Sequence, residues 1–143
     1  MEVMSPDPGL FVTALLFEPF ELWWATNQEP ALRERPLVSI RDERVQHANP
    51  AARREGITPG ISLAGARLKT SNLQVVDTEA DSLGQQWSWQ LEQLHGWSPW
   101  LHSPSVGRAW LLAEPTEVQR LSLEYGVQVG AASNRSWRWQ LRW

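Results

Sequence analysis

Segments typical of β-strands alternate with segments typical of helices along most of this chain. The run from Leu10 to Phe17 is continuously apolar and rich in strand formers, so we expect a buried strand there. After it, Phe20, Trp23 and Trp24 recur at positions i, i+3 and i+4, which is one face of a short helix. The full order reads βαββααβαββαβ, with a possible final helix. Strands dispersed among helices predict an α/β (α+β) fold in which one mixed sheet is covered by helices.

Local signals predict the boundaries of several elements. Asn49 and Pro50 suit the N-cap and first turn of a short helix that Gly56 would end. Ser62 can cap a second short helix, and Thr78 begins a pattern similar to a capping box before a long one. The strands expected after the first lie at residues 37–40, 45–48, 73–76, 97–103, 109–113 and 127–131.

Ten of the 143 residues are tryptophan. A chain of this length can bury roughly 70% of its unfolded surface, and 42% of its residues are apolar, so a folded core is expected. Most tryptophans should lie in this core, although a small domain has difficulty burying all ten. Trp89 lies off the apolar stripe of its predicted helix, so it packs on a second neighbour or faces solvent.

Charge and residue usage exclude several classes of function. The formal net charge of −3 argues weakly against tight non-specific binding of DNA. The chain has no cysteine, so disulfides and thiolate metal sites are excluded, and a cytoplasmic location is expected. Residues 1–9 lack the bases of a signal peptide and read as a flexible lead, which leaves residues 10–143 as a single domain. No apolar run approaches the ~20 residues of a membrane helix, so no membrane partner is expected.

Residues that could carry catalysis or hold a metal are scattered. Metal-dependent nucleotidyl transfer needs paired carboxylates, but only Asp42 and Glu43 are adjacent, and they fall in a predicted solvated turn. His47, His95 and His102 show none of the spacings of a zinc site. The nucleophile-elbow, Walker and dinucleotide-binding motifs are absent. The sequence therefore predicts no metal site and no cofactor.

Two segments could bind a partner. The first is the short helix that carries Arg53 and Arg54, although exposed arginines are commonly just solvated. The second is the C-terminal segment of residues 134–143, in which arginine and tryptophan are concentrated.

The C-terminal segment fits two periodicities. A helix would place three arginines on one face: Arg135, Arg138 and Arg142. A strand would alternate apolar with polar residues: Trp137, Trp139, Leu141 and Trp143 against Arg138, Gln140 and Arg142. Periodicity does not decide between them. Such a segment can grip phosphates and stack on bases, dock on a membrane surface, form a protein hot spot, or simply pack on the sheet as a final helix.

The stretch ANPAARREGITPGISLAGARL at residues 48–68 resembles the fingers region of Y-family (UmuC/DinB-like) DNA polymerases. Those proteins carry the pattern A-N-x-x-A-R-x-x-G-[IV]-x-x-G-M, then a short helix and a segment similar to residues 72–76. Residues 29–38 and 127–135 are similar to further family segments, so the resemblance covers nearly the whole chain from Leu10. The run WSPW and the missing acids look most like the catalytically inactive ImuB type.

The positions that hold metal ions in this family differ here. The family's first strand ends in a metal-binding aspartate within a V-D-x-D pattern, and Leu16 takes its place. Glu18 takes the position of the second aspartate. The family's S-x-D-E motif should fall in residues 101–107, which contain no carboxylate. The resemblance therefore implies no catalytic residues, because a lone acid does not hold two metal ions.

The positions that contact the incoming nucleotide in the family are also changed. Glu21 takes the place of the aromatic residue that screens the sugar, and Pro50 that of the tyrosine over the nucleotide. Arg53 alone is similar to the family's residue, an arginine that contacts the triphosphate. The resemblance thus implies a vestigial nucleotide-binding residue.

The sequence leads to three hypotheses of function. The first is a non-catalytic accessory or scaffold protein in DNA repair or damage-induced (SOS) translesion mutagenesis, truncated before the thumb and little finger. It would act through protein contacts made by Trp137, Trp139 and Trp143. The alternative is direct binding of single-stranded or duplex DNA by a set of arginines: Arg53, Arg54, Arg135, Arg138 and Arg142. The third is residual nucleotide binding by Arg53 without turnover. Self-association through a sheet edge or an apolar face is a further expectation.

Overall fold

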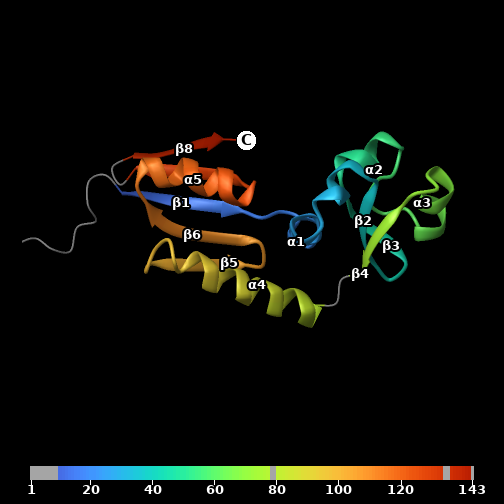
Figure 1. The fold of residues 1–143 in the computed structure, drawn as a ribbon, viewed down its shortest axis with the longest axis horizontal. Helices are drawn as coiled ribbons and strands as arrows, with labels where there is room; N and C mark the ends of the chain where they lie inside the picture. Colours follow the sequence, from blue (N-terminus) through green and yellow to red (C-terminus); the bar gives the residue numbers. More distant parts are fainter. Residues whose placement is uncertain (1–9, 78–79, 134–135, 143) are drawn as a thin grey trace, which may run out of the picture. The chain divides into compact units, whose positions relative to one another are not determined.

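The computed structural model describes residues 10–77, 80–133 and 136–142, and the chain divides into two compact units. One unit combines Met1–Phe17 with Gln85–Trp143, and the other is Glu18–Gly84. Each unit has its own sheet, as Figure 1 shows. The predicted mixed α/β class is confirmed, whereas the expectation of one sheet is wrong. The flexible lead predicted for residues 1–9 lies outside the described residues.

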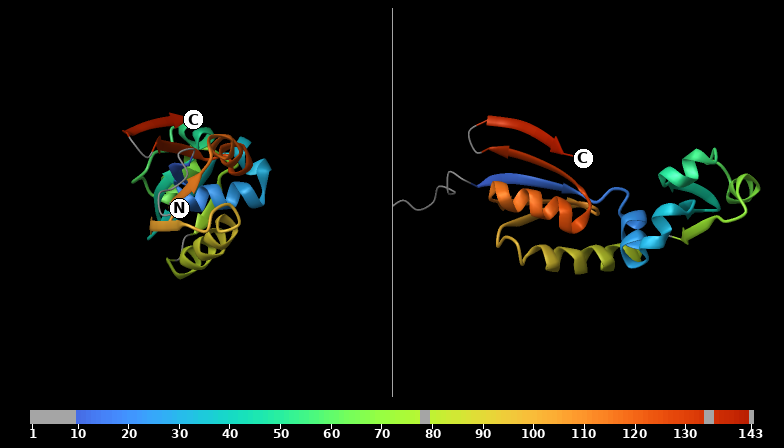
Figure 2. Two further views of the ribbon diagram at one scale, coloured as in Figure 1. Left: turned by 90° about the vertical axis from the view of Figure 1, so that its left-hand side faces the viewer. Right: turned by 45° about the horizontal axis from the view of Figure 1, so that its top comes forward.

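The first unit contains a five-stranded antiparallel sheet in the order β5-β6-β1-β7-β8. Its strands are β1 (Phe11–Leu16), β5 (Leu101–Ser105), β6 (Arg108–Ala113), β7 (Gln128–Ser133) and β8 (Ser136–Arg142). Helices α4 (Ala80–Leu94) and α5 (Pro115–Tyr125) lie against one face of this sheet (Figures 1 and 2). Strand β1 lies at the centre of this sheet between β6 and β7, and Ala14 is buried as well as its neighbours Thr13 and Leu15.

Alternate residues of β1 form the core between this sheet and its helices. Thr13, Leu15 and Phe17 are fully buried. The Phe17 ring meets Trp87 of α4 at 5.4 Å and Tyr125 of α5 at 5.8 Å between centroids, both edge to face. Each such aromatic pair contributes about 1 kcal/mol beyond the burial of its area. Phe17 therefore holds both helices against the end of β1.

The second unit contains a three-stranded mixed sheet in the order β3-β2-β4. Strand β2 pairs antiparallel with β3 and parallel with β4. The elements of this unit are α1 (Phe20–Gln28), the 3-10 helix η1 (Pro30–Glu34), β2 (Leu37–Arg41), β3 (Arg44–Ala48), α2 (Pro50–Arg54), α3 (Leu63–Lys69) and β4 (Gln74–Asp77).

Helices cover both faces of the three-stranded sheet. Val38 packs in one core cluster with Ala52 of α2 and Ala66 of α3. Leu37, whose side chain points to the opposite face, packs with Leu22 of α1. The first four residues of β2 are all buried for this reason.

Several predicted boundaries are confirmed. The Asn49 side chain caps α2, and the Ser62 hydroxyl accepts a hydrogen bond from the Gly65 amide at the start of α3. Gly126 ends α5 in the left-handed conformation, with φ of 61°. The capping box predicted at Thr78 lies outside the described residues. Among the described helices, none is long and apolar enough to cross a membrane.

Two predicted elements at the C-terminal half are corrected. The strand expected from residue 97 begins only at Leu101. Trp97 instead packs on α5, where its Nε1 donates to the Tyr125 hydroxyl at 3.1 Å and Arg120 lies 5.3 Å over its ring. The possible final helix is wrong as well, because Ser136–Arg142 forms β8 and pairs with β7.

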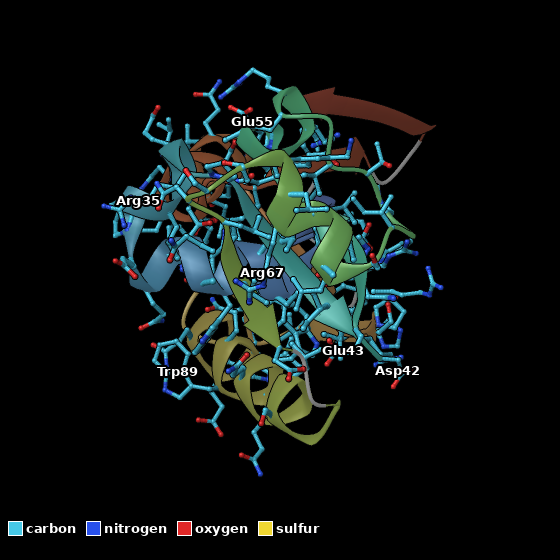
Figure 3. All side chains as sticks on the ribbon, turned by 90° about the vertical axis from the view of Figure 1, so that its right-hand side faces the viewer. Arg35, Asp42, Glu43, Glu55, Arg67 and Trp89 are labelled. Carbon is cyan, nitrogen blue, oxygen red and sulfur yellow. The ribbon has the colours of Figure 1, made fainter. Side chains whose placement is uncertain are left out.

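The tryptophans are less buried than their sequence predicts. Of the seven whose side chains the structure describes, only Trp87 is buried; four are half-buried: Trp23, Trp24, Trp97 and Trp110. Trp89 and Trp100 are exposed by 51% and 46%, and Trp89 projects from the outer side of α4 (Figure 3). Two small units have more surface for their volume than one domain, so large rings remain at their margins.

Candidate palm and fingers positions

The end of β1 lies beside the turn between β5 and β6. In the ladder, Leu16 stands opposite Arg108, and Arg108 stands opposite Ser105 on its other side. The Phe17 amide extends this contact by donating a 2.7 Å hydrogen bond to the Gly107 carbonyl. The structure thus brings together the two segments where the family resemblance expects metal ligands.

The side chains at this sheet end do not fit a divalent cation. Such cations take oxygen ligands, and carboxylates above all, but Leu16 is apolar and residues 101–107 contain no acid. The Ser103 hydroxyl is already engaged, since it accepts from Trp87 Nε1 at 2.8 Å and donates to the Arg108 carbonyl at 2.8 Å. Glu18 belongs to the second unit. Across the described part of the chain, no group of three or more potential ligands is found.

A cluster that sequence reasoning missed joins α1 to the β2–β3 hairpin. The Glu21 carboxylate accepts a hydrogen bond from the Ser39 hydroxyl at 3.0 Å, and the same oxygen lies 2.6 Å from His47 Nδ1. Ser39 and His47 are direct partners in the hairpin ladder, which places them side by side. A predicted hairpin at these strands would have placed Ser39 and His47 opposite each other. The position of Glu21 could not be predicted in this way, because it depends on how α1 packs against the hairpin.

This cluster is built for holding the unit together and not for nucleophilic catalysis. A serine nucleophile needs a base that accepts its proton and is itself oriented by a third group. Here Ser39 and His47 both bond to Glu21 and not to each other. Glu21 occupies the position expected to screen a sugar, and its side chain is only 12% exposed. Its carboxylate is committed to partners within the unit.

The arginines predicted at α2 lie together on its last turn. Arg53 and Arg54 are exposed, and within the described residues neither side chain makes a hydrogen bond or an ion pair. The Lys69 amine lies near the residue that follows this turn, 3.8 Å from where a Cβ on Gly56 would stand. Cations at this end of a helix also offset the negative pole of its dipole, which is a structural reason for their presence.

The remaining predicted binding residues fall in or beyond β8, in the other unit. Trp137, Trp139, Arg138 and Arg142 lie on this strand, which settles the open choice between helix and strand. Their side chains are outside what the structure describes, as are Arg135 and Trp143 altogether. Their roles in binding stay predictions.

Asn49, the asparagine of the A-N motif, has a structural role that requires no ligand. It is 8% exposed, and its Oδ1 accepts hydrogen bonds from the Leu37 and Ala52 amides at 3.0 and 2.9 Å. Its Nδ2 donates to the carbonyls of Leu32 and Arg35 at 3.3 and 2.8 Å. One side chain therefore joins η1, β2 and α2.

Comparison with known proteins identifies the fold. No protein-family model matches the sequence, and no curated protein is significantly similar to it. Among solved structures, a Dbh ternary complex matches with a TM-score of 0.64 and 19% identity, over 87% of this chain. A Dbh–Dpo4 Y-family DNA polymerase chimera matches with a TM-score of 0.62 and 17% identity, over 85% of this chain. DinB from Sulfolobus solfataricus matches with a TM-score of 0.58 and 17% identity, over 86%.

This chain spans 42% of the length of each of these three proteins. At such low identity the likeness concerns the fold, and it extends over both units. The fold of this chain is that of the palm and fingers of Y-family DNA polymerases.

Proposed function

We propose that this chain is a non-catalytic, Y-family-polymerase-like accessory protein of the ImuB type, acting in DNA repair or damage-induced translesion mutagenesis. It contributes contacts to other proteins and not nucleotide transfer. The tryptophans at its C-terminal end, Trp137, Trp139 and Trp143, are the proposed anchors, since tryptophan is enriched at interface hot spots.

One observation carries this proposal. The segments that would supply metal ligands in this fold meet at the end of β1, yet they present Leu16 and a turn without acids. Nucleotidyl transfer depends on cations held by carboxylates, which neutralise charge on the attacking and leaving oxygens. Removing groups that act as such a unit typically costs many orders of magnitude in rate.

Single-nucleotide incorporation on a primed template tests the proposal. With Mg²⁺ or Mn²⁺ in excess, we expect no extension that follows the protein through its final purification step. A variant with Leu16→Arg serves as the matched control, because its positive charge at the end of β1 would repel any metal ion bound there. Extension that co-purifies with the wild-type chain and disappears in the variant would refute the proposal.

A second candidate function is direct binding of DNA, favoured by the unpaired cations at the end of α2. Arg53 and Arg54 are exposed on the last turn of α2, and Lys69, also exposed, lies near Gly56 just after it, so a phosphate backbone that reached this turn could meet positive charges beside the single acid Glu55. Neutralising phosphates releases counterions, which makes such binding weaken steeply with salt. The C-terminal arginines proposed for the same role are Arg135, Arg138 and Arg142.

Fluorescence anisotropy of labelled single-stranded and duplex DNA separates this candidate from the first. Direct binding predicts an affinity that falls between low and moderate salt, with a slope reduced by about one for each phosphate contact removed. Replacing Arg53 and Arg54 by alanine should then lower the affinity, whereas Arg33→Ala on η1 should not. If DNA binding is absent at low salt, or if its affinity does not change with salt, direct DNA binding is refuted and the protein-contact function remains as the proposal.

A further inference from the structure

The only tyrosine of the chain, Tyr125, shares a hydrogen bond with a tryptophan. Trp97 follows α4 and Tyr125 ends α5, two helices on the same face of the five-stranded sheet (Figure 1). The two rings meet edge to face, with 6.3 Å between centroids, and the distance from Trp97 Nε1 to the Tyr125 hydroxyl is 3.1 Å. Because the chain has no cysteine, tryptophan and tyrosine are the side chains that lose one electron most readily. Two such side chains are therefore in direct contact through their polar atoms.

Trp97 is placed where a one-electron oxidant in solution can reach it, since its side chain is only half-buried. The Arg120 guanidinium lies 5.3 Å over its ring. A cation at this place is attracted to the electron-rich face of the neutral ring, but it repels the positive charge of a ring that has lost an electron. The oxidised ring therefore gives up its Nε1 proton and becomes a neutral radical. Its bare nitrogen then faces the Tyr125 hydroxyl as an acceptor.

Tyr125 can supply the hydrogen that this nitrogen lacks. Burial raises the pKa of its phenol, which has an ordinary value of about 10, so the hydroxyl keeps its proton at neutral pH. The tyrosyl radical is more stable than the tryptophanyl radical under these conditions, which gives the transfer its direction. The O–H bond of Tyr125 breaks, the N–H bond of Trp97 forms again, and Trp97 returns to its original state. In sum, the oxidant gains one electron, one proton passes to water, and Tyr125 remains as a neutral radical.

We propose that Tyr125 is an oxidation site of this chain, to which Trp97 passes a radical across their shared hydrogen bond. The reactants that would use this site are one-electron oxidants that attack tryptophan. The packing of Phe17 against Tyr125 at 5.8 Å keeps the phenol ring in place for the transfer. The inference is independent of the proposed accessory function, because it uses only the contacts around these two rings.

Pulse radiolysis of the full chain at neutral pH tests the proposal, with the azide radical as the oxidant because it takes an electron from tryptophan. Tryptophanyl and tyrosyl radicals absorb at different wavelengths, and any tyrosyl absorption must come from Tyr125. The expected result is a tyrosyl band that rises while the tryptophanyl band decays, at a rate that does not depend on protein concentration. The rise should be slower in D₂O, since the transferred hydrogen exchanges with solvent.

Two variants show whether the radical passes through the hydrogen bond. Trp97→Phe keeps an aromatic ring but removes its nitrogen, so the fast rise of the tyrosyl band should be lost. Trp89→Phe is the matched control, because it removes a more exposed tryptophan, and the rate of the rise should stay the same. No tyrosyl band in the wild-type chain would overturn the proposal, as would an equally fast rise in Trp97→Phe. A rise that is equally fast in H₂O and D₂O would overturn it without any variant, because no hydrogen would then move in the transfer.

Discussion

Replacing Asn49 by alanine removes four hydrogen bonds from the interior of the second unit. Two amides, of Leu37 and Ala52, lose their acceptor, and two carbonyls, of Leu32 and Arg35, lose their donor. The loss of the N-cap bond costs about 1 kcal/mol. Each of the other three bonds contributes about 1 kcal/mol, and more where a buried group is left without a partner. We expect the variant to lose about 4 kcal/mol of stability, a large share of the 5–15 kcal/mol typical of a folded domain.

Asn49→Asp divides this loss. The carboxylate still accepts from the Leu37 and Ala52 amides, but it cannot donate to the two carbonyls and faces them with negative charge. We expect a loss of about 2 kcal/mol or more, set by the two missing donated bonds. Asn72→Ala is the matched control, since Asn72 is exposed and its side chain makes, among the described residues, a single 3.5 Å contact with Gln74; the change should alter stability by less than about 0.5 kcal/mol.

Native-state amide hydrogen exchange in β2 measures the effect for the second unit alone, whatever the other unit does. The amides of Val38 to Ile40 are suitable probes because these residues are buried at the centre of their sheet. A loss of no more than about 1 kcal/mol for Asn49→Ala would mean that Asn49 acts only as a helix cap. Unchanged protection in Asn49→Asp would contradict the role assigned to its amide group.

Three further predictions concern other buried or strained groups. Gln90 is 2% exposed, and its Nε2 has no hydrogen-bond partner among the described residues. Gln90→Leu should therefore raise the free energy of unfolding by about 1 kcal/mol in urea titrations; a decrease would show that the amide is satisfied by buried water. Asp42 and Glu43 form the tip of the β2–β3 hairpin with positive φ values of 54° and 63°, which strain side chains other than asparagine and glycine. The double variant Asp42→Asn, Glu43→Gly should therefore be more stable by about 1–2 kcal/mol. Unchanged stability would contradict backbone strain at this turn. Burial raises the pKa of Tyr125, so the folded chain keeps its phenol protonated while the unfolded chain ionises, and stability should fall as pH rises above about 10. Tyr125→Phe should reduce that fall; an equal fall in the variant would refute the assignment.

Much of the element order is predictable because capping residues and helix-ending glycines act through contacts with residues close to them in sequence. The cap at Asn49 and the stop at Gly126 each involve contacts within a few residues, and the structure confirms both. Strand pairing is different. The partners of β1 are β6 and β7, which lie in the second half of the chain, so no local pattern shows that the strands separate into two sheets.

The C-terminal segment shows a second limit. Its arginines and tryptophans satisfy a helical and a strand periodicity equally well, so the choice depends on β7, whose edge offers a ladder. The Glu21–Ser39–His47 cluster is a third case, because it needs α1 to dock on the hairpin. Only the family resemblance predicts that Leu16 lies next to the β5–β6 turn, since neither segment contains a carboxylate or another residue that by itself indicates a site.

Paramagnetic broadening by Mn²⁺ in the amide NMR spectrum tests the central claim most directly, because it reports on the protein itself and is insensitive to a contaminating polymerase. The account predicts that the amides at the end of β1 and in the β5–β6 turn, among them Leu16 and Gly107, broaden no more than other exposed amides. A variant with Leu16→Asp and Ser105→Asp should gain selective broadening there and serves as the positive control. Selective broadening at these amides in the wild-type chain would contradict the account, because it would place a metal ion where the residues described here supply no ligand.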